Sequence, residues 1–295
     1  MAVMTWSFER VAGPFAFTEG PAWDGNGLLF TDMPNDRILR YDPDTDDCTE
    51  HLTGTNGANG IKFGPDGHLY ACEGAARRVT RYDTEGETTV IADGYDGHRL
   101  NSPNDLAFDA DGRLWFTDPY YGDDPDSLEL GHRSVYRATP DDDRGDDGWE
   151  LDRMTHDTTN PNGLLVSPDG QRLHVAELRY GTDEDRELRS YRIRDDGSLG
   201  EYDVLHNFYP HRAIDGMALD GEGNIVGAAG SVESGPGPML YVFARNGRVL
   251  ETHPFPGDQP TNCTFGGADN ATLYVTGDGC LYRAETDRAG YLTAP

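Results

Sequence analysis

Residues 104–118, NDLAFDADGRLWFTD, contain the pattern that decides the fold of this 295-residue chain. A polar residue precedes a short apolar run, a Gly/Asp turn follows, and a second apolar run ends the unit. This order occurs six times, and each opening residue carries a carboxylate or a carboxamide. The units open at Glu19, Asn59, Asn104, Asn162, Asp215 and, one residue shorter, Asn262.

The spacing of these units predicts a propeller. Successive second runs lie 40 to 59 residues apart, counted through Leu29, Leu69, Leu114, Leu173, Ile225 and Leu273. Periods of about 40–50 residues with several strands per unit are typical of propeller blades. A third strand follows in every unit, as in RILRYD from Arg37, and several units show a fourth, such as TTVIAD from Thr88. We therefore predict an all-β, six-bladed β-propeller forming one domain over residues 1–295.

Composition supports an all-β chain. It contains 37 glycines and 18 prolines, and no apolar stretch with a 3.6-residue period is long enough for a core helix. Two packed β-sandwiches are the alternative interpretation. The strands of sandwiches need not recur in phase, whereas these do, which favours the propeller.

The chain is strongly acidic. Its 53 acidic residues outnumber 24 basic ones, the net charge is −29, and Lys62 is the single lysine. Acidic side chains hold water and counter-ions, and strong salt screens their mutual repulsion. The bias resembles that of proteins from a salt-rich cytoplasm, with an acidic mesophilic enzyme as the alternative. Nucleic acid would be repelled as a partner.

The remaining global features predict a cytoplasmic location. The first ten residues, MAVMTWSFER, contain no apolar core of a signal peptide, and no stretch approaches the length of a membrane span. The cysteines show no CxxC spacing, so we expect reduced, mainly structural thiols at Cys48, Cys72, Cys263 and Cys280. No membrane partner is expected.

The repeat also places a candidate site. The first strand of each blade lines the central channel of a propeller. Counting across the turns puts Asn104 opposite Thr117 or Asp118, and Glu19 opposite Asp32, so both strands share one mouth of the channel. We predict that five side chains converge there, with four more in a second tier: Glu19, Asn59, Asn104, Asn162 and Asp215, then Asp32, Glu73, Asp118 and Glu177.

Such a ring of side chains suits a hard divalent cation. Buried carboxylates without a counter-charge repel each other and lose hydration. Glu19 and Asp215 supply two negative charges, and the asparagines supply amide oxygens, which are ligand types that calcium takes. No histidine or cysteine stands at a ring position, which argues against structural zinc. We predict one divalent cation, with calcium favoured over manganese, magnesium and zinc.

Turn formation is the alternative for individual members of the ring. Asn-Gly and Asp-Gly pairs are common in turns. Several such pairs in phase at the mouth of a ring favour a site. For Asn59 and Asn262 the capping of a turn is the stronger alternative.

Several motifs in combination resemble a known family. They are EGPAW at Glu19, NSPNDL at Asn101, FTDP at Phe116, PNGL at Pro161, DGM at Asp215 and TNCTFGG at Thr261. Over nearly the whole chain they are similar to the family of gluconolactonase, senescence marker protein and luciferin-regenerating enzyme. The resemblance implies a six-bladed propeller that hydrolyses a sugar lactone with one divalent metal at the channel mouth.

The resemblance implies roles for individual residues. Glu19, Asn162 and Asp215 would bind the metal, and Asp215 would also be the general acid/base. Asn104 would contact substrate, or complete the coordination as in the related diisopropylfluorophosphatase group.

The loop before Asn104 departs from part of the family. It reads RLNSPND, which is longer than the RxND of the animal members and looks like a bacterial gluconolactonase branch. Arg99 and Asn101 are therefore alternative substrate contacts, and Asp118 is another side chain that could bind sugar hydroxyls. The segment YYGDDPDSLELGHR from Tyr120 is either a lid or a solvated insertion.

We expect a hydrolysis in which the cation polarises the lactone carbonyl and water, activated by the cation or by Asp215, attacks it. Asp215 would then return a proton to the leaving ring oxygen. Two alternatives stay open: a phosphotriesterase or arylesterase of the diisopropylfluorophosphatase type, and a non-enzymatic ligand-binding propeller. Such binding modules usually lack a carboxylate pair like Glu19 and Asp215 at the channel.

Overall fold

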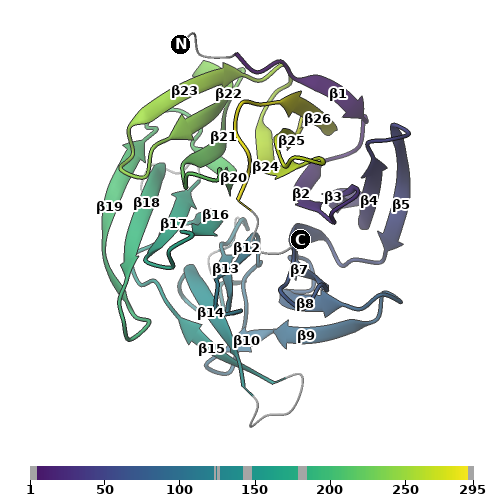
Figure 1. Cartoon of the computed structure of the whole chain (residues 1–295). Helices are drawn as coiled ribbons and strands as arrows, with labels where there is room; N and C mark the ends of the chain where they lie inside the picture. Colours follow the sequence, from purple (N-terminus) through teal and green to yellow (C-terminus); the bar gives the residue numbers. More distant parts are fainter. Residues whose placement is uncertain (1–4, 123, 125–126, 142–147, 179–184, 292–295) are drawn as a thin grey trace.

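The computed structural model describes residues 5–122, 124, 127–141, 148–178 and 185–291. In this part of the chain, six four-stranded antiparallel sheets stand as blades around a ring, as Figure 1 shows. The predicted six-bladed β-propeller is confirmed. In blades one to five, the chain runs from the innermost strand to the outermost one.

Blades one to three contain β2 (Thr18–Trp23), β3 (Leu28–Asp32), β4 (Arg37–Asp42), β5 (Asp47–Thr53), β6 (Ala58–Phe63), β7 (Leu69–Glu73), β8 (Arg78–Tyr82), β9 (Thr88–Ala92), β12 (Leu106–Phe108), β13 (Leu114–Asp118), β14 (Ser134–Pro140) and β15 (Trp149–Arg153). Blades four to six contain β16 (Pro161–Val166), β17 (Arg172–Glu177), β18 (Glu187–Ile193), β19 (Leu199–Asn207), β20 (Ile214–Leu219), β21 (Ile225–Ser231), β22 (Ser234–Phe243), β23 (Val249–Pro254), β24 (Pro260–Gly266), β25 (Thr272–Gly277) and β26 (Cys280–Glu285). Outside the blades lie the 3₁₀ helix η1 (Met33–Asn35) and the ribbon of β10 (Gly94–Tyr95) and β11 (His98–Arg99).

The sixth blade is completed by the other end of the chain. β1 (Glu9–Ala12) pairs antiparallel with β26, with Glu9 opposite Arg283, and is the outer strand of this blade. Sequence reasoning did not identify this fourth strand, because it lies before the first repeat. The pairing joins an early strand and a late strand of the sequence in one blade and so closes the ring.

Apolar side chains fill the space between neighbouring blades. Val226 and Leu240 of blade five form one buried cluster with Leu273 and Val275 of blade six. All residues of β3 and β13 are buried, because each second strand is covered on both faces. This packing holds the innermost strands in a fixed circle around the channel.

The innermost strands approach each other closely because glycine follows the ring residue in four blades. A Cβ atom at Gly20 would lie 2.2 Å from the carbonyl oxygen of Asn59, and one at Gly216 would lie 2.1 Å from Cγ of Asn262. Both distances are far below van der Waals contact, so a side chain does not fit there. Asn59 and Asn262 themselves lie inside β6 and β24, so the alternative that they cap turns is wrong.

The four cysteines are free thiols, and Cys72, Cys263 and Cys280 are buried. This agrees with the expectation of mainly structural thiols. Over the described ranges of the chain, no helix has the length and hydropathy needed to cross a membrane.

Candidate metal-binding active site

A cavity of about 570 Å³ opens at one mouth of the channel. The repeat predicted a ring of five polar side chains, and all five line this cavity: Glu19, Asn59, Asn104, Asn162 and Asp215. Side chains from the surrounding loops, including Tyr121 and Arg212, complete the wall. Asn262, the sixth repeat residue, does not line the cavity and instead donates from Nδ2 to Glu19.

Glu19 is a buried carboxylate on β2 with 4% of its surface exposed. Its Oε2 atom accepts hydrogen bonds from the N–H of Gly20 at 2.7 Å and from Asn262 Nδ2 at 3.3 Å. Burial raises the pKa of Glu19 well above its ordinary value, and the negative charges of Asp215 and Asp105 raise it further. A positive charge in the cavity would therefore stabilise the ionised form of this group.

Asp215 lies on β20 and is held by a buried arginine. Arg212 donates from Nη2 to Asp215 Oδ2, and from Nη1 to the carbonyl oxygens of Gly230 at 3.1 Å and Pro260 at 3.0 Å. Burial raises the pKa of Asp215 to about 6, the guanidinium of Arg212 lowers it, and the charge of Asp105 raises it. The arginine thus fixes the rotation of the carboxylate predicted to be the general acid/base.

Asn104 and Asn162 share one hydrogen-bond partner. The Nδ2 atoms of Asn104 and Asn162 donate to the hydroxyl oxygen of Tyr121 at 3.2 Å and 2.8 Å. Each asparagine is only 5% exposed. Tyr121 belongs to the segment interpreted as a lid or an insertion, part of which, at residues 123, 125 and 126, lies outside the described residues. Its described part contributes directly to the cavity wall.

The cavity offers the donor set of a hard divalent cation. Five blades contribute a carboxylate or carboxamide side chain to its wall, and the oxygens of such groups are ligands that calcium prefers. The Oδ1 atom of Asn59 is buried and has no hydrogen-bond partner, so it is an unsatisfied acceptor beside the cavity. Among the residues that the structure describes, no group of three His, Cys, Asp or Glu side chains could hold a metal ion. A cation here would therefore depend on the asparagines as well as on Glu19 and Asp215.

Asp105 is a third buried carboxylate that sequence reasoning missed. Its Oδ1 atom accepts a hydrogen bond from the N–H of Leu106 at 2.9 Å, and its Oδ2 atom lies 3.5 Å from Asn262 Nδ2. Burial raises the pKa of Asp105, and the positive charge of Lys62 lowers it. One feature of the sequence could have identified Asp105: four other blades carry glycine at the position where blade three carries this aspartate.

The three other predicted substrate contacts do not line the cavity. Asp118 is fully buried and accepts the N–H groups of Asn101 at 2.9 Å and Ser102 at 2.8 Å. Asn101 also donates from Nδ2 to the carbonyl oxygen of Asp118. Arg99 is exposed on β11 and donates to the carbonyl oxygen of Ala76. From this loop, Ser102 lines the cavity together with Asn104. A role of Asp118, Asn101 and Arg99 in binding substrate stays a prediction.

Comparison with known proteins identifies the family. A family model described as SMP-30/Gluconolactonase/LRE-like region matches residues 17–278. The chain belongs to this family. A gluconolactonase from Zymomonas mobilis is 31% identical over 96% of this chain and 82% of its own length. The solved structure of a gluconolactonase from Xanthomonas campestris has a TM-score of 0.81 and 32% identity, and the match covers 95% of this chain and 89% of the other.

A third relative is named for a different sugar lactone. It is a pentonolactonase from Haloferax volcanii, which is 26% identical over 92% of this chain and 86% of its own length. The relatives therefore include enzymes named for six-carbon and for five-carbon sugar lactones.

The predicted second tier of carboxylates does not point into the channel of this family member. Glu19 lies opposite Thr31, and Asp32 lies opposite Thr18, so the predicted pairing of Glu19 with Asp32 is wrong by one residue. A bulge between Glu19 and Ala22 shifts the register. A shift of one residue moves a side chain to the other face of a sheet.

The four second-tier carboxylates instead bind the segment that enters their own blade. Asp32 accepts the N–H groups of Ala16 at 3.1 Å and Phe17 at 3.3 Å. Glu73 accepts from Asn56 Nδ2 at 3.1 Å. We call these side chains the clasp carboxylates: Asp32, Glu73, Asp118 and Glu177.

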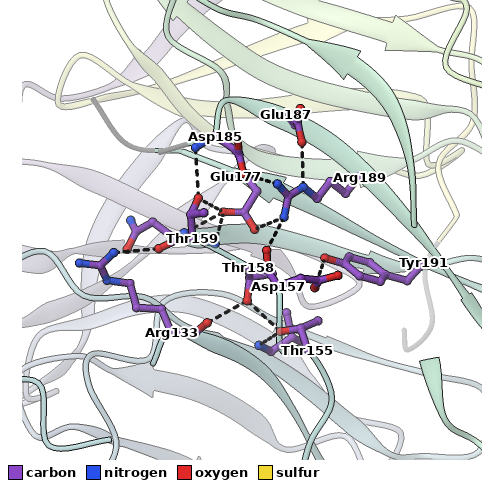
Figure 2. A network of polar contacts seen from close by, with 12 residues as sticks. Arg133, Thr155, Asp157, Thr158, Thr159, Glu177, Asp185, Glu187, Arg189 and Tyr191 are labelled. Atoms are coloured by element: carbon purple, nitrogen blue, oxygen red, sulfur yellow. Dashed lines mark hydrogen bonds and ion pairs between the residues drawn. The ribbon is translucent and has the colours of Figure 1, made fainter. Parts of the chain in front are cut away.

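The clasp of blade four lies in the polar network of Figure 2. Glu177 Oε2 accepts the N–H groups of Thr159 at 3.1 Å and Asn160 at 2.7 Å. Its Oε1 atom lies 3.3 Å from Nη1 of Arg189, a fully buried guanidinium that also contacts Asp185. The segment that leads to Asn162 is therefore fixed by buried charges on β17 and β18.

Proposed function

We propose that this protein is a metal-dependent lactonase that opens the ring of an aldonolactone to give the aldonic acid, as a gluconolactonase does. The observation that carries the proposal is that three buried side chains, Glu19, Asn162 and Asp215, line one cavity. It is supported by membership of a family that includes enzymes named gluconolactonase and pentonolactonase. A cavity of about 570 Å³ has room for a sugar lactone.

The residues of the cavity would hold one divalent cation, and calcium fits them best. Glu19 and Asp215 would contribute carboxylate oxygens, while Asn162 and Asn104 would contribute carboxamide oxygens. When bound, the cation supplies Lewis-acid polarisation of the lactone carbonyl.

Asp215 is the residue that moves protons in this proposal. Arg212 donates to its Oδ2 atom, and each carboxylate oxygen has two lone pairs, so acceptor capacity remains for a proton. The carboxylate would take a proton from the attacking water as the new C–O bond forms. It would return that proton to the ring oxygen as the C–O bond of the lactone breaks.

A substrate panel tests the proposal. We expect purified protein in high-salt buffer with calcium to hydrolyse glucono-, galactono-, xylono- and arabinonolactone. The rate is measured by pH-stat titration of the acid released. Paraoxon and phenyl acetate serve as the comparison substrates. Rates confined to these two esters would replace the lactonase proposal with an esterase. If protein treated with a chelator hydrolysed lactones at an undiminished rate, the reaction would not depend on a metal.

A further inference from the structure

The outer wall of the cavity differs from its floor. The floor is formed by the ring residues, whose side chains end in carboxylates and carboxamides. In blades one and two, the residues just before the first strand and just after the second strand also line the cavity: Phe17, Met33, Gly57, Gly74 and Ala75. We call these five residues the apolar wall, because none of them has a side chain that donates a hydrogen bond.

The backbone of the apolar wall offers no free donor either. Each of its five N–H groups donates to another group of the protein, and the acceptors are Asp32 Oδ1 for Phe17 (3.3 Å), the Phe17 carbonyl for Met33 (3.1 Å), Asp36 Oδ1 for Gly57 (2.8 Å), the Gly57 carbonyl for Gly74 (3.2 Å) and the Asn56 carbonyl for Ala75 (3.2 Å). A sugar hydroxyl placed against this wall loses hydrogen bonds to water and finds no donor in their place, which is unfavourable.

Two side chains of the apolar wall are not used by the core. Phe17 and Met33 are partly exposed, and neither belongs to a hydrophobic cluster among the residues that the structure describes. Apolar side chains that line a pocket in this way are typical contacts of a ligand. The apolar wall therefore suits a part of the substrate that carries no hydroxyl.

The position of Asp215 indicates which part of a lactone reaches the apolar wall. Asp215 belongs to blade five, which stands opposite blade two in the ring of six blades (Figure 1). In the proposed reaction it acts at the carbonyl carbon and the ring oxygen. The atoms farthest from that carbon then extend toward blades one and two, and in an aldonolactone the farthest carbon along the chain is the terminal one.

We propose that the apolar wall gives this enzyme a preference for aldonolactones that end in a methyl group instead of a hydroxymethyl group, which are the lactones of deoxy sugars. This inference rests on the proposed lactonase function and narrows its substrate class. A hydrophobic pocket rejects an added hydroxyl by about 100-fold at most. Because Ala75 of the apolar wall is exposed to solvent, we expect a smaller preference, of about 10-fold.

Matched pairs of lactones test the preference. L-Fuconolactone differs from L-galactonolactone, and L-rhamnonolactone from L-mannonolactone, only in having a terminal methyl group in place of the hydroxymethyl group. The kcat/KM of the purified protein with calcium is measured by pH-stat titration for all four. We expect it to be about 10-fold higher for the methyl member of each pair.

A substitution in the apolar wall shows whether this wall sets the preference. Glutamine is close to methionine in length and adds a donor that can reach a terminal hydroxyl. Met33→Gln should therefore lower the ratio of the two kcat/KM values within each pair by about threefold or more, which corresponds to one modest hydrogen bond. Val249→Gln, at an exposed position on β23, is the control and should leave the ratio unchanged. Both variants should keep the melting temperature of the unaltered protein.

The outcomes separate this inference from the proposed function. Equal kcat/KM values within both pairs, or higher values for the hydroxymethyl lactones, would overturn the inference and leave the proposed lactonase intact. An unchanged ratio in Met33→Gln would also overturn it, because the preference would then come from another part of the cavity. If none of the four lactones is hydrolysed, the proposed function itself fails, and the inference fails with it.

Discussion

Blades one to four differ from blades five and six in how they hold the segment that enters the blade. In the first group, the second strand ends in a clasp carboxylate that accepts hydrogen bonds from that segment. Blades five and six carry Ala229 and Gly277 at the same position. In blade five the charged side chain is a cation and lies on the entering segment instead of on the second strand. Arg212 of this segment donates to the carbonyl oxygen of Gly230.

This difference follows from the charges of the cavity. Blade five contributes Asp215, which already lies near the carboxylates of Glu19 and Asp105. Another carboxylate behind Asp215 would raise the free energy needed to ionise these three carboxylates. The guanidinium of Arg212 instead attaches the entering segment and offsets their negative charge. In blade six a clasp has no room, because a Cβ atom at Gly277 would lie 2.8 Å from Cα of Pro260.

The largest effect is expected in blade five. Asp215→Ala should lower kcat/KM for lactones by about 10³-fold or more, since it removes the proposed proton-transfer group and a cation ligand. Thermal denaturation should show an intact fold. Asp203→Ala, which removes an exposed aspartate of blade four, is the control. Full lactonase activity in Asp215→Ala would refute the assignment.

The clasp of blade four should dominate stability. Glu177→Ala leaves Arg189 and the N–H groups of Thr159 and Asn160 without their buried acceptor, so the free energy of unfolding should fall by about 3 kcal/mol. Urea denaturation measures this. Glu50→Ala breaks a solvent-exposed pair with Arg37 and should cost less than about 1 kcal/mol. Equal losses in the two variants would show that the clasp is not important for stability.

Replacement of the blade-five arginine should have an intermediate effect on activity. Lysine keeps the charge but cannot donate in the planar fork that reaches Asp215, Gly230 and Pro260 together. We therefore expect Arg212→Lys to lower kcat/KM by about 10- to 100-fold, which is typical for groups that hold a metal ligand in place, as Arg212 would hold Asp215. Arg40→Lys, at a partly exposed pair with Asp24, should stay within about twofold, a margin set by the weakness of such pairs. A similar small change in Arg212→Lys would contradict the role given to the arginine.

The smallest effects should separate two clasps by pH. Burial raises the pKa of Asp118 to about 7, so its contribution to stability is present at acid pH and is lost as pH rises from about 4 through 7. Burial also raises the pKa of Asp32, but the bonds from Asn35 and Arg37 outweigh it and leave the pKa lowered. The stabilisation from Asp32 is therefore present above about pH 4 and is lost as pH falls.

Melting temperatures between pH 2 and 8 measure this contrast. Between pH 4 and 7, Asp118→Asn should gain stability relative to the unaltered protein by about 1 kcal/mol for each pH unit. Asp32→Asn should be less stable than the unaltered protein above about pH 4, and this difference should shrink as pH falls below about 4. All other titrating groups are shared, so they cancel in each comparison. Parallel curves for the three proteins would show that the two clasps titrate alike.

The ring of the site could be predicted from sequence because its residues recur in phase. Glu19 and Asp215 stand at equivalent positions of their repeats, and radial symmetry brings equivalent positions to one mouth. The second tier could not be placed in the same way. Gly20 has a positive φ of 49° in the bulged part of β2, and the resulting one-residue shift turns Asp32 away from the channel.

Other contributors have no counterpart in the repeat. Tyr121 comes from the segment between β13 and β14, and Arg212 lies just before β20, so both are outside the repeated runs. Asp105 stands where the neighbouring blades have glycine, so the sequence indicated it only as an exception to the repeat. A periodic pattern identifies what the blades share, whereas the asymmetry that turns a ring into a site depends on single residues.

Closure of the ring also sets an order of events during synthesis. Residues 9 and 283, which pair between β1 and β26, are 274 positions apart. On the ribosome, β1 is made before its partner and before all the strands that lie between them in the sequence. The earlier blades can fold as they emerge, but β1 stays without its partner until β26 has also been made. The circle of cavity residues therefore reaches its final geometry only after β26 has emerged.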